Sequence, residues 1–140
     1  MLDSPMTFHI DPQLERDSIW VCDLSLCQVR LRNDSRWPWL ILVPKRPEVV
    51  DITDLSEADG AQLMAEIRSS HHAVMAWRHP LKTNIAWLGN VVRQLHIHVI
   101  GRREGDTGWP GPVWGIANPV PYTNTAIDTH VTCLRDWLIG

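Results

Sequence analysis

Two histidines and a glutamine alternate with branched apolar residues in the segment 94–100, whose sequence is QLHIHVI. A period of two is typical of a half-buried β-strand, so the alternation predicts that Gln94, His96 and His98 project from one face of that strand. Side chains two residues apart on a strand lie roughly 6 to 7 Å from each other, close enough for two imidazoles to contact one phosphate group or one metal ion. The residue types therefore predict a chemical site on this strand.

A metal site is the weaker interpretation of the two imidazoles. Such a site needs a third protein ligand, and the sequence offers no Asp or Glu at a suggestive spacing from His96. The sequence therefore predicts no metal ligands. The other histidines are interpreted as structural, because two adjoin on a predicted helix and the rest are isolated: His71 and His72, then His9, His79 and His130.

The elements that would position this strand follow from alternation, apolar runs and turn residues. Strands are expected at 18–26, 27–32, 40–43, 82–87 and 94–100, a short helix or turn within 8–16, a long helix from Asp54 to before Pro80, and a last helix from about 125. Antiparallel strands with one long helix inserted predict an α+β fold, namely an antiparallel meander sheet of about five strands. Without a repeat or linker, residues 1–140 are expected to form a single domain.

Composition restricts the partners. The net charge of -3 and a pI near 6.1 disfavour binding to nucleic acid, which needs a basic surface, and leave a small anionic ligand open. No apolar run approaches the roughly twenty residues needed to span a membrane, and residues 1–5 lack the features of a signal peptide. Three cysteines without metal-binding spacing are typical of reduced thiols. We therefore expect a cytoplasmic protein without a membrane partner.

Eight tryptophans stand against one tyrosine and one phenylalanine. Trp37 and Trp39 are interpreted as packing residues whose indole N–H groups find local partners. Trp109 and Trp114 bracket a Gly/Pro-rich stretch shortly after the histidine strand, where a loop is able to form a lid or a wall over the site.

Segment 94–100 closely resembles the signature of the histidine triad (HIT) superfamily, in which three histidines alternate with apolar residues. Gln94 stands at the first histidine position, so the chain resembles a bacterial-type HIT hydrolase with one substitution in its triad. The similarity extends from about Asn33 to Trp114, and includes the run 40–46 (LILVPKR) and the helix start at Asp54.

The resemblance implies a nucleotide hydrolase or transferase that splits a bond to an α-phosphate through a nucleotidyl-histidine intermediate, without metal or another cofactor. His96 would be the nucleophile, its Nδ1–H held by a backbone carbonyl, and His98 would contact the phosphoryl oxygens. The implied substrate is a dinucleoside polyphosphate first and a nucleoside phosphoramidate second. The resemblance also implies a homodimer.

Gln94 keeps the backbone carbonyl and can form hydrogen bonds, but it cannot carry a proton. A nucleotide-binding or regulatory module without turnover therefore stays open as the alternative function. The expected substrate contacts are four polar or basic residues around the motif: Asn90, Asn84, Asn33 and Arg93.

Overall fold

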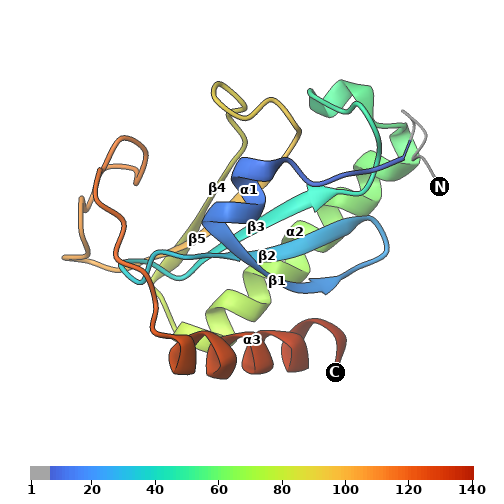
Figure 1. Cartoon of the computed structure of the whole chain (residues 1–140). Coiled ribbons are helices and arrows are strands. Elements are labelled where there is room, and N and C mark those ends of the chain that lie inside the picture. The colour runs from blue at the N-terminus through green and yellow to red at the C-terminus, as the bar shows by residue number, and fades with distance from the viewer. Residues whose placement is uncertain (1–6) are drawn as a thin grey trace.

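A computed structural model describes residues 7–140 and is shown in Figure 1. The expectation about residues 1–5 lies outside the described residues. Within the described part, the strands are β1 (Ser18–Asp23), β2 (Cys27–Arg32), β3 (Trp39–Pro44), β4 (Lys82–Ala86) and β5 (Ile97–Arg102). The helices are α1 (Pro12–Asp17), the single 3-10 turn η1 (Ile52–Asp54), α2 (Glu57–Arg78) and α3 (Asn124–Ile139).

The five strands of residues 7–140 form one antiparallel sheet in the order β1-β2-β3-β5-β4. The long helix α2 connects β3 to β4, and α3 closes the described chain. The predicted α+β fold, with a sheet of about five strands, one long helix and a C-terminal helix, is confirmed.

Helix α2 begins at Glu57, three residues after the predicted start at Asp54, which instead ends η1. The Ser56 side chain accepts a hydrogen bond from the Asp59 N–H, and the acidic residues Glu57 and Asp59 occupy the first turn, where the helix dipole favours negative charge. The helix ends at Arg78, and its C-cap residue His79 adopts a left-handed conformation immediately before Pro80. No helix in residues 7–140 is long and apolar enough to cross a membrane.

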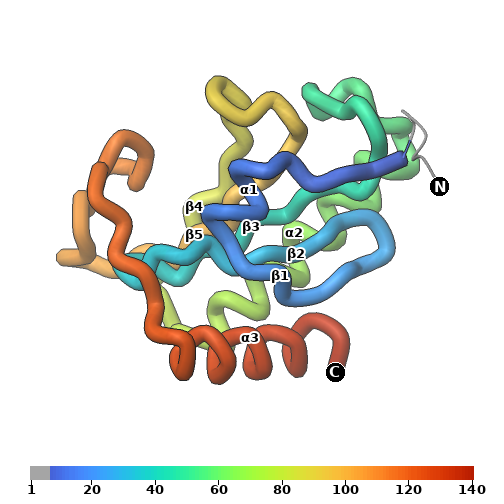
Figure 2. Tube along the Cα trace, in the orientation of Figure 1, coloured from blue at the N-terminus to red at the C-terminus, as the bar shows by residue number. Residues whose placement is uncertain are grey.

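Strand β3 divides the core into two layers because its side chains alternate between the two sheet faces. Leu40 and Leu42 pack with residues of α2 and α3, whereas Trp39, Ile41 and Val43 pack on the other face with Leu14 of α1. All six β3 residues are buried, as the apolar run predicted. Figure 2 shows α3 on one side of the sheet, and α1 with the segment before it on the other.

The histidine segment is strand only in part. Strand β5 begins at Ile97, and its pairing with β3 ends at Leu42–Ile97. The preceding residue Leu95 instead donates its N–H to the carbonyl of Val49, and its side chain is buried among the α2-side core. The prediction that residues 94–100 form one strand is therefore wrong at its N-terminal end, because residues 94–96 precede β5.

Candidate active site

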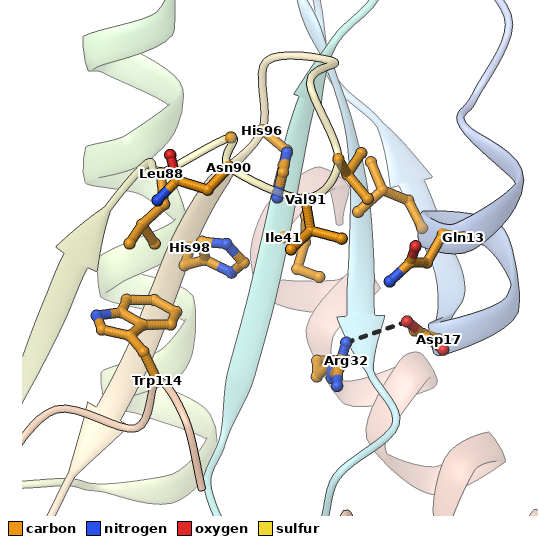
Figure 3. A pocket seen from close by; sticks show the side chains of 13 residues that line it. Gln13, Asp17, Arg32, Ile41, Leu88, Asn90, Val91, His96, His98 and Trp114 are labelled. Atoms are coloured by element: carbon orange, nitrogen blue, oxygen red, sulfur yellow. Dashed lines mark ion pairs between the residues drawn. The ribbon is translucent and has the colours of Figure 1, made fainter. Parts of the chain in front are cut away.

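His96 and His98 lie together on the face of the sheet opposite α2 and α3. Their ring centroids are 4.9 Å apart, and the two side chains are 7% and 8% exposed. They line a cavity of about 290 Å³, shown in Figure 3. The pocket is bounded by α1, by the end of β2, by the β4–β5 connection and by Trp114.

The ring of His96 is oriented by the main chain of Gln94. Its Nδ1 lies 2.7 Å from the Gln94 carbonyl oxygen. A carbonyl oxygen only accepts, so Nδ1 must carry the hydrogen and Nε2 must hold the free lone pair when the ring is neutral. This geometry leaves His96 Nε2 available as a nucleophile.

The ring of His98 has the opposite arrangement. Trp39 donates its indole Nε1–H to His98 Nδ1 at 3.0 Å. An indole nitrogen only donates, so Nδ1 is unprotonated and Nε2–H of the neutral ring is left as a hydrogen-bond donor. Burial, followed by the proximity of His96 and Arg32, lowers the pKa of His98 from 6.5 to about 3. His98 is therefore a neutral donor at pH 7.

Aromatic rings enclose the His98 imidazole. Trp114 packs against it with centroids 4.8 Å apart, and Trp39 does so at 5.6 Å. Trp114 lines the cavity, as expected for a wall of the site. Trp109 instead packs against Arg102, whose guanidinium carbon lies 5.6 Å from the centroid of the Trp109 ring. Trp39, interpreted from sequence as a packing residue, therefore also positions a residue of the site.

The opposite wall carries the charged groups that the sequence analysis missed. Gln13, Leu14 and Asp17 of α1 line the cavity together with Arg32, the last residue of β2. The Arg32 guanidinium lies 3.5 Å from the Asp17 carboxylate and 5.2 Å from the centroid of the Trp39 ring. Arg32 also borders two adjoining cavities of about 260 and 190 Å³. It places a cation beside the histidine pair.

The four expected substrate contacts lie in different places. Asn90 lines the histidine cavity, on the exposed connection between β4 and β5. Asn33 borders the adjoining cavity of about 190 Å³, and its Oδ1 accepts a hydrogen bond from the Tyr122 N–H at 2.9 Å. Arg93 is exposed on the β4–β5 connection. Asn84, on β4, accepts a hydrogen bond from Arg102 at 3.0 Å.

The Asn84 side chain belongs to a hydrogen-bond network around Arg102. The Arg102 guanidinium is buried, contacts Asp106 through Nε and Nη2 at 2.8 Å each, and donates from Nη1 to the Gly111 carbonyl. Asn84 supplies a further acceptor to the same nitrogen. The network holds the loop that leads to Trp114, so Asn84 supports a wall of the site from outside the cavity.

The side chain of Gln94 bonds the N-terminal segment and does not line the histidine cavity. Its Oε1 accepts from the Asp11 N–H and its Nε2 donates to the His9 carbonyl, each at 2.8 Å. The chain bends before β5, and the amide bonds the N-terminal segment, which packs on the same face of the sheet as the histidines. Only its carbonyl takes part in orienting His96.

The histidine pair lacks a third potential metal ligand in the region that the structure covers. Residues 7–140 contain no group of three or more His, Cys, Asp or Glu side chains arranged to hold a metal ion.

Comparisons with known proteins agree with this geometry. The family model described as the HIT domain matches residues 13–105. A crystal structure of a histidine triad protein from Sinorhizobium meliloti 1021 is 45% identical, with a TM-score of 0.92, and the match covers 94% of this chain and 98% of that chain. A histidine triad protein from Bradyrhizobium japonicum is 42% identical with a TM-score of 0.91, and the match covers 94% of this chain and 98% of that chain. That from Marinobacter aquaeolei VT8 is 38% identical, again with a TM-score of 0.91, covering 94% and 96%. No curated protein matches the chain.

Proposed function

Because the chain belongs to the HIT family, we propose that it is a metal-independent nucleotide hydrolase or nucleotidyl transferase that forms a covalent intermediate on His96. It cleaves at the α-phosphate of a nucleoside phosphate derivative. The observation that carries this proposal is the hydrogen bond from His96 Nδ1 to the Gln94 carbonyl, since it leaves the Nε2 lone pair free to attack phosphorus.

The first step is an in-line displacement. His96 Nε2 attacks the α-phosphorus, a P–N bond forms, and the P–O bond to the leaving group breaks with its electron pair on the departing oxygen. The neutral His98 donates its Nε2–H to a non-bridging phosphoryl oxygen, where negative charge is held in the transition state. In the second step water attacks phosphorus, the P–N bond breaks, and water loses a proton to solvent as His96 is restored.

A dinucleoside polyphosphate is the leading substrate because of its leaving group. A nucleoside polyphosphate departs as a stable anion near pH 7, whereas the amine of a phosphoramidate must gain a proton as it leaves. The Gln94 side chain cannot carry a proton and is bonded to His9 and Asp11. The Arg32 cation beside the cavity also favours a ligand with several negative charges.

The cavity suits a nucleoside as well as a phosphate. Its walls combine the apolar side chains of Leu14, Ile41, Leu88 and Val92 with the polar groups around the histidines. A site of this kind buries a flat base against apolar side chains and fixes its orientation by a few polar contacts. Asn90 and Arg32 are the proposed polar contacts on opposite walls.

We expect the protein to act as a homodimer through the β4 edge of the sheet. Among residues 7–140, β4 has one neighbouring strand, β5, so its other edge offers backbone groups that no described strand pairs. Exposed apolar side chains surround this edge: Met64, Leu81, Ile85 and Trp87. Met64 and Ile85 border a common cavity of about 300 Å³ between α2 and β4.

The test is hydrolysis of a panel of dinucleoside polyphosphates and nucleoside phosphoramidates in the presence of a chelator. His96→Ala should lower turnover by at least about a thousandfold, because it removes the attacking atom. His72→Ala, which alters an exposed histidine on α2, is the matched control and should retain native turnover. Turnover lost on chelation would favour a metal site, and tight nucleotide binding without turnover by the native protein would favour a non-catalytic nucleotide-binding module.

A further inference from the structure

We propose that Gln94 is a positioning residue whose side chain holds the N-terminal wall of the cavity, so that it sets nucleotide affinity rather than the rate of the chemical step. The proposal rests on the proposed function, because it requires the cavity beside His96 to bind nucleotide. It assigns a role to the residue at which this chain departs from the triad of its family.

The Gln94 amide binds two backbone groups of one extended segment. Its Oε1 accepts from the Asp11 N–H and its Nε2 donates to the His9 carbonyl, both at 2.8 Å. Asp11 in turn caps α1, since its Oδ1 accepts from the Gln13 N–H at 2.8 Å. The side chain of Gln94 thus holds the residue from which the helix begins.

Helix α1 forms one wall of the cavity. Gln13, Leu14 and Asp17 line it, and Asp17 contacts Arg32 on the neighbouring strand at 3.5 Å. The far end of the helix is held by Arg30, whose Nη2 donates to the carbonyl of Ser18 at 3.0 Å. The near end is held by Gln94 through its hydrogen bond to Asp11. A shift of the near end therefore moves the side chains that meet the ligand.

Apolar packing limits how far this wall can move. Phe8, Ile10 and Leu14 pack with Trp39 and Ile41 in the core on the same face of the sheet. Loss of the Gln94 contacts should therefore loosen α1 without detaching it. We expect a weakening of nucleotide binding by about tenfold, equivalent to the loss of about one net hydrogen bond's contribution.

The main chain and the side chain of Gln94 have separate roles. The carbonyl oxygen holds His96 Nδ1–H, whereas the amide faces the N-terminal segment. A substitution at position 94 keeps the carbonyl, and so the tautomer of His96, while it removes the clamp on α1. A histidine there has two diverging ring nitrogens and cannot serve a donor and an acceptor of the same segment as an amide does.

The first experiment measures two sets of constants in Gln94→Ala, Gln94→Glu and Gln94→His. They are kcat and KM for the dinucleoside polyphosphate that the native protein hydrolyses, and the Kd for AMP. Gln94→Glu is nearly isosteric but points a carboxylate oxygen at the His9 carbonyl. All three should raise KM and the Kd for AMP about tenfold, with kcat within about threefold of native and an unchanged pH profile of kcat. The control Gln62→Ala, in which the lost amide bonds Glu66 on α2, should change neither constant.

Two kinetic results would overturn the proposal. One is a fall in kcat, or a shift in its pH profile, at constant KM, because the side chain would then act on the reacting groups. The other is a rise in kcat in Gln94→His at constant KM, because position 94 would then work as a triad member. If the native protein turns over no substrate, the proposed function fails while the Kd for AMP still decides the role of Gln94.

The second experiment follows amide hydrogen exchange in residues 9–17, with and without AMP. Exchange at the Asp11 amide should be faster in Gln94→Ala than in native protein, and AMP should slow exchange across α1 in the native protein. Native exchange rates in Gln94→Ala would overturn the proposal, as would α1 exchange that AMP leaves unchanged in a protein that binds AMP.

Discussion

At the scale of single residues, the site contains two neighbouring imidazoles with different protonated nitrogens. His96 carries its hydrogen on Nδ1 because a carbonyl accepts it, and His98 carries its hydrogen on Nε2 because the Trp39 indole donates to Nδ1. The first ring therefore offers a lone pair and the second a donor. Attack on a phosphate needs both groups, a nucleophile and a partner for the charged oxygens.

Trp39→Phe tests the tautomer of His98. The ring remains packed, but the donor is lost, so His98 can also place its hydrogen on Nδ1, which faces away from a phosphate at Nε2. We expect kcat to fall about tenfold, less than the loss from complete removal of a transition-state donor. Nitrogen NMR of the His98 ring should show the Nε2–H form in native protein and a mixture in the variant.

Trp37→Phe is the matched control for that prediction. Trp37 packs beside Trp39 with centroids 6.0 Å apart, but its indole N–H donates to the Thr107 carbonyl. Its substitution should leave the His98 tautomer and kcat unchanged. An Nδ1–H tautomer of His98 in the native protein would contradict this account of the site.

The lowered pKa of His98 predicts a pH dependence of stability. The folded protein keeps His98 neutral down to about pH 3, whereas in the unfolded chain the ring takes up a proton below about pH 6.5. The unfolded state then binds more protons, so the free energy of unfolding falls as the pH drops from 6.5 toward 3. From pH 7 to 5 the contribution of His98 should amount to about 1–2 kcal/mol.

Urea unfolding of native protein and His98→Asn, at pH 7 and pH 5, measures this contribution. Asparagine keeps an acceptor for the Trp39 indole but does not titrate. The loss of stability between the two pH values should be about 1–2 kcal/mol smaller in His98→Asn. Equal losses in the two proteins would show that His98 is not held neutral by the fold.

At the scale of elements, the strands and helices were largely readable from the sequence, and the contacts between them were not. Alternation and apolar runs predicted β2, β3 and β4 to within a residue or two, because each depends on its own local pattern. The end of β1 at Asp23 and the start of β5 at Ile97 differ from the prediction by three residues each. Both boundaries depend on the neighbouring strand, which local alternation does not record.

The site was predictable to the extent that one segment carries it. His96, His98 and Asn90 fall within nine residues and line one cavity. Trp39 pairs with His98 across 59 positions, and Gln94 pairs with His9 across 85. Arg32 and Asp17 are ordinary surface charges in sequence and meet the cavity only through the pairing of β2 and the position of α1. Such partners become apparent only when the elements are placed.

Substitutions of Asn84 and Asn90 test two different roles, which are support of the cavity wall and contact with the ligand. Asn84→Ala removes an acceptor from the buried Arg102 network, so the free energy of unfolding should fall by about 1–2 kcal/mol, with KM unchanged. Asn90→Ala, on the exposed connection lining the cavity, should raise KM severalfold without loss of stability. Thermal denaturation and steady-state kinetics of both variants provide the measurements, and the reverse pattern would contradict these assignments.

At the scale of the whole molecule, the two faces of the sheet have different tasks. Helices α2 and α3 cover one face, where their apolar side chains pack with those of the strands in the larger of the two core layers. The other face carries α1, the Arg102-anchored loop and the histidines between them. His98 lies on β5 and His96 immediately precedes it, so the sheet and the core behind it support both imidazoles, and the side chains proposed to bind ligand lie on surrounding segments.

Ile85→Lys tests the expected dimer. A charge at the open edge of β4 opposes the addition of a second strand, so light scattering after size exclusion should show a dimer for the native protein and a monomer for the variant. Ile85 is 41% exposed. Val120→Lys, at a residue 48% exposed beyond the Trp114 loop, is the control and should stay dimeric. A native monomer at high concentration would contradict the expectation.

The central claim is that His96 carries the nucleotidyl group, and the most direct measurement is the mass of the intact protein quenched under alkaline conditions during turnover of a dinucleoside polyphosphate in chelator. The account predicts a transient increase by one nucleoside monophosphate unit, mapped to His96 by peptide fragmentation and absent from His96→Ala. Full turnover by His96→Ala, or native turnover in which no adduct forms on His96 even with rapid quenching, would contradict it.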